Sequence, residues 1–97
     1  AMAVHDADKL DSIGAVGIGR AFLFSGEVGA KLHNPSADIH ATSAYSEEDT
    51  AYREFIHKLQ YIRDRMLTGE GKRIAEGRHV FMEKFFEELH EEVKGNR

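Results

Sequence analysis

The spacing of apolar residues along the chain predicts helices and gives no convincing strand. In the first segment, residues 6–26, small and apolar side chains recur every three or four positions: Ala7, Leu10, Gly14, Gly17, Ala21 and Phe24. That spacing places them on one face of a helix. Glycine inside a helix costs about 0.5–1 kcal/mol relative to alanine. The glycines therefore indicate close approach by another helix or by a ligand, and a packing reason is the commoner of the two.

Two further helices are predicted in the second half of the chain. Ser46, with Asp49 three residues later, resembles a capping box and predicts a helix over 46–68. A broad apolar stripe predicts a third helix over 71–94: Ile74, Phe81, Met82, Phe85, Phe86, Leu89 and Val93. Residues 27–45, which include Pro35, are predicted to be irregular. The predicted fold class is all-α, with about three main helices and one long loop.

The composition limits the classes of function. A chain of 97 residues forms a single domain, of which residues 1–3 are set aside as a tag remnant or a start codon behind a tag residue. The net charge of −4 gives no electrostatic reason to bind nucleic acid or an anionic membrane. No apolar run is long enough to span a bilayer. The absence of cysteine excludes disulfides and cysteine-ligated zinc, and with no signal peptide at the acidic start we expect a cytoplasmic protein.

Three carboxylates stand close together at the start of the first predicted helix, at Asp6, Asp8 and Asp11. Acids at a helix N-terminus interact favourably with the helix dipole, by about 0.3–1 kcal/mol each. Because they lead directly into residues expected in the core, they are also consistent with a site for a hard metal ion. The residues alone leave both interpretations open. Other motifs fail, since the glycines at 14, 17 and 19 lack the spacing of a dinucleotide-binding loop.

The segment around these carboxylates resembles a known family. Residues 6–20 read Asp-Ala-Asp-Lys-Leu-Asp-Ser-Ile-Gly-Ala-Val-Gly-Ile-Gly-Arg. The string is similar to the final metal-ligand helix of HD-superfamily phosphohydrolases, and most similar to bacterial HD-domain hydrolases. A second set of residues follows that family's order and spacing: Thr50, Ala51, Phe55, Lys58, Leu59, Met66, Thr68, Gly71, Ala75, Arg78, His79, Phe81, Met82 and Phe85. The likeness covers about residues 4–26 and 50–91.

The resemblance implies an all-α HD-domain-like fold and hydrolysis of phosphate esters or nucleotides with a divalent metal such as manganese or magnesium. By the match, Asp8 is the last metal ligand and the catalytic carboxylate, and Asp6 is a candidate to support it. The resemblance also implies that Lys9 and Arg20 neutralise phosphate oxygens. The chain departs from the family at Lys9, where arginine is commoner, and at Glu54, where relatives often have histidine. These differences affect substrate contacts rather than the fold.

The other metal ligands of the family, a histidine and an adjacent His-Asp pair, belong to helices upstream of the last aspartate. His5-Asp6 spells that pair only two residues before Asp8, and we interpret it as coincidence. The resemblance therefore predicts the C-terminal portion of such a hydrolase, inactive as this chain alone and associating as a homodimer through uncovered apolar faces. Two alternatives stay open. One is a stand-alone helical oligomerisation or interaction module that has lost catalysis, and the other is a small metal-binding protein that uses Asp6, Asp8, Asp11 and loop histidines.

Overall fold

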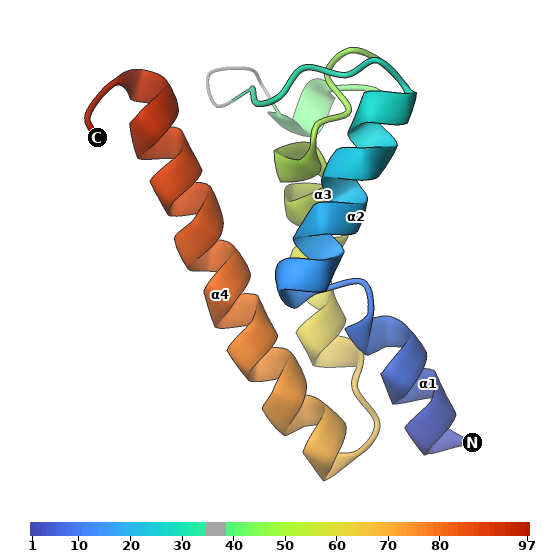
Figure 1. Cartoon of the computed structure of the whole chain (residues 1–97). Coiled ribbons are helices and arrows are strands. Elements are labelled where there is room, and N and C mark those ends of the chain that lie inside the picture. The colour runs from blue at the N-terminus through green and yellow to red at the C-terminus, as the bar shows by residue number, and fades with distance from the viewer. Residues whose placement is uncertain (35–38) are drawn as a thin grey trace.

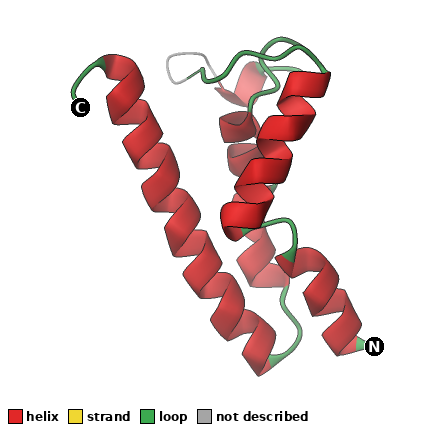
Figure 2. Ribbon diagram, in the orientation of Figure 1, coloured by secondary structure: helices red, strands yellow, loops and turns green. Residues whose placement is uncertain are grey.

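The computed structural model describes residues 1–34 and 39–97, and within these residues it contains helices and no strand (Figures 1 and 2). The elements in chain order are α1 Met2–Leu10, α2 Gly14–Glu27, η1 Ile39–Ala41, α3 Ala51–His57, η2 Leu59–Arg65 and α4 Gly69–Lys94, where η denotes a 3-10 helix. The prediction of an all-α fold is confirmed. No helix among the described residues is long and apolar enough to cross a membrane.

The first predicted helix is two helices, because the chain turns sharply between Leu10 and Gly14. Gly14 adopts a φ of +73°, which side chains rarely tolerate. A Cβ on Gly17 would lie 2.3 Å from the backbone oxygen of Ser12, so the turn folds tightly over the first turn of α2. Arg78 of α4 secures this junction by donating to the backbone oxygen of Leu10 at 2.6 Å. The glycines thus serve packing, as the commoner interpretation held, although the close neighbour of Gly17 is a turn rather than another helix.

The second predicted helix begins later and is broken. Thr50, rather than Ser46, caps α3, because its hydroxyl accepts a hydrogen bond from the backbone N–H of Arg53 at 3.1 Å. Asp49 does not complete a capping box with Ser46. It is fully buried and pairs with Arg53 at 3.1 Å. After Lys58 the chain continues as the 3-10 helix η2 rather than as α-helix.

The third predicted helix, over 71–94, is confirmed, and it begins two residues earlier than predicted. α4 runs from Gly69 to Lys94 and ends at Gly95, whose left-handed φ of +82° supplies the C-terminal cap. It lies along one side of the molecule (Figure 1) and contacts α2, η2 and α1. Phe86 of α4 stacks on Phe55 of α3 with ring centroids 5.1 Å apart. This contact lies in a core of buried apolar side chains that come from α2, α3, η2, α4 and the residues flanking them: Ile13, Ile18, Ala21, Ala51, Phe55, Leu59, Met66, Ala75, Met82 and Phe86.

Described residues of the predicted irregular segment form hydrogen bonds and an ion pair with the residues that directly precede α3. Asn34 is buried, and its amide donates to the backbone oxygen of Glu48 at 3.0 Å while accepting from the hydroxyl of Thr50 at 2.6 Å. Lys31 pairs with the carboxylate of Glu48. Pro35, which belongs to the predicted irregular segment, lies outside the described residues. The described parts of the segment are therefore attached directly to the start of α3.

Candidate functional site

The acidic cluster at the start of the chain divides between the interior and the surface. Asp6 of α1 is only 3% exposed, and its carboxylate accepts from the backbone N–H groups of Leu67 and Thr68 at 2.9 and 2.8 Å. It also accepts from the hydroxyl of Thr68 at 2.6 Å. These hydrogen bonds, the one from the Thr68 hydroxyl foremost, hold the pKa of Asp6 well below its usual range. Asp6 therefore joins α1 to the start of α4.

Asp8, two residues after Asp6 on α1, lies on the surface of the protein. Its side chain is exposed, as is that of Asp11. The carboxylate that enters the core is that of Asp6 rather than that of Asp8. That carboxylate accepts from backbone and hydroxyl donors, and its Oδ1 also lies 3.1 Å from Nδ1 of His5. Because the Asp8 side chain is exposed, its carboxylate oxygens are accessible to a bound ligand.

The described residues do not form a metal centre by themselves. Among them, no group of three or more histidine, cysteine, aspartate or glutamate side chains is arranged to hold an ion. The loop histidines do not join the acids. His33 contacts His90 of α4 with nitrogens 2.8 Å apart, and the His40 ring lies 5.8 Å from that of His57. Since a divalent ion needs several donors, Asp8 alone does not fit a complete site.

A cavity of about 270 Å³ opens where the end of α1 meets α3 and η2. We call it the basic cavity, because four of its lining residues carry basic groups: Lys9, His57, Lys58 and Arg65. The remaining wall consists of two hydroxyls and two apolar side chains: Ser12, Tyr61, Leu59 and Ile62. Lys9 follows directly after Asp8 on α1. The structure thus places one of the two predicted phosphate-binding residues in a concave and cationic setting.

A second cavity, of about 230 Å³, adjoins the basic cavity and shares Ser12 and Leu59 with it. We call it the Arg20 cavity. Arg20, the other predicted phosphate-binding residue, lines it from α2 and reaches back to the backbone oxygen of Asp11 at 3.4 Å. Glu54 of α3 faces it from the other wall, and burial raises the pKa of the Glu54 carboxyl. Lys9 and Arg20 therefore lie on two neighbouring cavities rather than in one.

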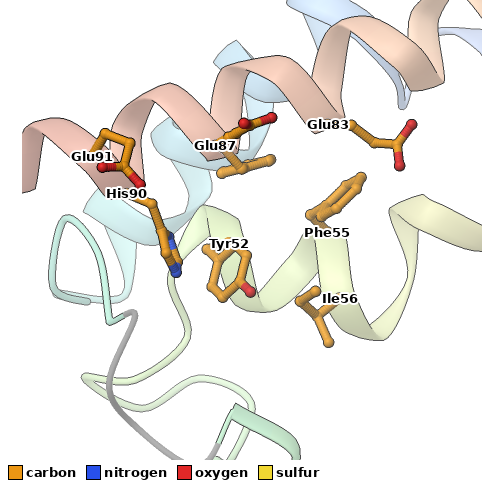
Figure 3. Close-up of a pocket in the computed structure, with 8 residues that line it drawn as sticks. Tyr52, Phe55, Ile56, Glu83, Glu87, His90 and Glu91 are labelled. Atoms are coloured by element: carbon orange, nitrogen blue, oxygen red, sulfur yellow. The ribbon is translucent and has the colours of Figure 1, made fainter.

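A third cavity, of about 340 Å³, lies between α3 and α4 and has the opposite character (Figure 3). Its α4 wall carries three carboxylates, from Glu83, Glu87 and Glu91, and His90 reaches down toward Tyr52 of α3. Carboxylates in this arrangement repel phosphate. This cavity therefore does not suit a phosphate ligand.

Sequence reasoning missed most of the basic cavity. Arg65 reads as a helix-end charge in the sequence, and His57 and Lys58 lie inside a predicted helix. Their common location depends on the break after Lys58, where α3 gives way to η2. Lys58 does lie in the second set of residues that resembles the HD family, and this was the available signal.

Comparisons with known proteins agree with the resemblance. The chain is 43% identical over 93 residues to the uncharacterized protein YpgQ of Bacillus subtilis strain 168, which is 96% of this chain and 40% of that protein. A crystal structure of YpgQ in complex with ADP superposes with a TM-score of 0.75 at 39% identity, over 95% of this chain and 44% of that one. An HD-superfamily hydrolase from Bacillus thuringiensis superposes with a TM-score of 0.80 at 34% identity, over 94% of this chain and 44% of the hydrolase.

These likenesses show an HD-like fold. The chain spans less than half the length of the relatives that it matches. No protein-family model matches the chain.

Proposed function

We propose that this chain is the part of an HD-type, metal-dependent phosphohydrolase that supplies Asp8 as one ligand of a divalent metal ion. The observation that carries the proposal is the placement of α1. It presents an exposed Asp8 directly beside Lys9, which lines the basic cavity. The fold likeness to an HD-superfamily hydrolase supports the same conclusion. The remaining ligands belong, on this proposal, to other segments of a longer polypeptide.

The substrate on this proposal is a phosphate ester or a nucleotide. Lys9 and Arg20 contribute positive charge on two adjoining cavities, and such charges neutralise phosphate oxygens. The relative YpgQ has been crystallised with ADP, which supports a nucleotide ligand. Asp6 supports the site indirectly, because its hydrogen bonds to Leu67 and Thr68 fix the position of α1.

The test compares this chain with the longer polypeptide that contains it, in a manganese-supplemented assay of nucleotide hydrolysis. We expect no turnover by the chain alone. In the longer polypeptide, Asp8→Asn lowers turnover by about 100-fold or more, because losing a group that merely supports a metal ligand already costs roughly 10–100-fold. Asp11→Asn is the matched control, since Asp11 is also exposed near the end of α1.

Two outcomes contradict the proposal. Unchanged turnover in Asp8→Asn rejects the ligand assignment, and metal-dependent turnover that purifies with this chain alone rejects the need for further ligands. A longer polypeptide with no hydrolase activity favours instead the stand-alone interaction module.

A further inference from the structure

The basic cavity joins two parts of the chain that are distant in the sequence. Lys9 comes from the end of α1, whereas Lys58 and Arg65 come from the end of α3 and from η2. Only Lys9 belongs to the string that resembles a metal-ligand helix. The other cations therefore need an explanation of their own.

Two of these three cations have no counter-ion among the described residues. Among the described residues, Lys9 and Arg65 form no ion pair with a carboxylate, and Lys58 has only a 3.6 Å contact to Glu54. The chain as a whole has a net charge of −4, so this concentration of positive charge is not a consequence of composition. Like charges on one concave wall repel one another, and a bound anion relieves that repulsion.

The wall that carries these cations is held in place by the core. Leu59 and Met66, near the two ends of η2, are 9% and 4% exposed. Between them, Arg63 forms an ion pair with Glu76 of α4 at 3.1 Å. The backbone around Arg65 is thus fixed before any ligand arrives, which lowers the entropy cost of binding.

We propose that the basic cavity binds the phosphate group of the substrate, with Lys58 and Arg65 as binding residues beside Lys9. The identity of the ligand as a substrate rests on the proposed function, whereas the binding itself requires no catalysis. Two hydroxyls, from Ser12 and Tyr61, add hydrogen-bond donors to the same wall. The cavity is concave and local, which fits a small anion rather than an extended nucleic acid.

A purely structural role for these side chains makes a different prediction. Basic residues near the carboxyl end of a helix interact favourably with its dipole, and Arg65 lies at the end of η2. On that reading, removing the charge changes the stability of the protein but not its affinity for an anion. The phosphate affinity of charge-removing variants therefore separates the two roles.

The experiment titrates this chain with inorganic phosphate at constant ionic strength and follows its backbone amides by NMR. We expect shifts confined to residues 9–12 and 57–65, and none when chloride replaces phosphate. Lys58→Gln and Arg65→Gln each weaken binding by about ten-fold, because each removes a charge-assisted hydrogen bond. The matched control is Lys72→Gln, an exposed lysine of α4 outside the cavity.

Two further variants separate binding from folding. Arg65→Lys retains the charge and restores most of the affinity. Glu54→Gln frees Lys58 from its 3.6 Å contact and tightens binding, so it moves the affinity in the opposite direction from Lys58→Gln. Equal phosphate affinity in the parent, Lys58→Gln and Arg65→Gln proteins overturns the proposal, as do shifts spread over the whole chain.

Failure of the cavity proposal and failure of the proposed hydrolase function give different results. Phosphate binding that depends on Lys58 and Arg65, in a polypeptide that hydrolyses nothing, supports the cavity and rejects the enzyme. Turnover that depends on Asp8 but is indifferent to Lys58→Gln and Arg65→Gln supports the enzyme and rejects the cavity.

Discussion

Replacing His33 by phenylalanine should flatten the dependence of stability on pH. His33 packs between two aromatic neighbours, with its Nε2 2.8 Å from Nδ1 of His90 and its ring centroid 5.1 Å from that of Tyr52. Its Nδ1 atom is buried without a partner among the described residues. Burial, and then repulsion from His90, lower the pKa of His33 to about 4 from 6.5. A phenylalanine ring occupies similar space and cannot titrate.

The sign of the effect follows from proton uptake. Between pH 6.5 and about 4 the unfolded chain binds a proton at position 33 that the folded chain does not. The free energy of unfolding therefore falls as the pH falls through this window. The full difference between the two pKa values is worth about 3 kcal/mol. Because His33 is only half-buried, solvent screening reduces the effect to about 1–2 kcal/mol.

The measurement is urea denaturation at pH 7 and pH 4.5 for the parent, for His33→Phe and for the control His40→Phe, whose site in η1 is exposed. Other groups also titrate here, among them Glu54, whose raised pKa acts in the opposite sense. Groups that do not contact position 33 are common to all three proteins and cancel in the difference. We expect the stability lost on acidification to be smaller in His33→Phe than in the parent by about 1–2 kcal/mol, and His40→Phe controls for replacing a histidine away from this contact. Equal losses in the parent and in His33→Phe would refute the reasoning.

Two further predictions concern packing and association. Gly71→Ala should destabilise the protein by about 1–3 kcal/mol, as overpacking does, because its Cβ would lie 2.3 Å from Oδ2 of Asp6. Gly77→Ala, with no atom near its Cβ, should instead stabilise α4 by about 0.5–1 kcal/mol; thermal unfolding compares the two, and equal effects would contradict the contact with Asp6. The chain should associate at micromolar concentration, because Val16, Leu23 and Phe81 are 60%, 71% and 47% exposed. Light scattering that shows a clean monomer would contradict this.

Local patterns in the sequence were sufficient to predict the helices as a class and one helix in detail. α4 could be predicted because its apolar stripe repeats over 26 residues and because Gly95 ends it. Both signals act between residues a few positions apart, so the sequence contains them directly. The candidate residues Asp8, Lys9 and Arg20 also came from one contiguous string, through its resemblance to a family.

Contacts between distant residues decided the rest. The burial of Asp6 rather than Asp8 depends on donors from Leu67 and Thr68, which lie more than fifty positions away. The basic cavity likewise exists only because the chain bends after Lys58 and brings Arg65 to the end of α1. Helical periodicity predicts which residues share a face, but it does not specify which other segment covers that face. The packing of the whole core determines which segment covers each face. Asp6 can be buried because its carboxylate receives hydrogen bonds there that replace those it would make to water.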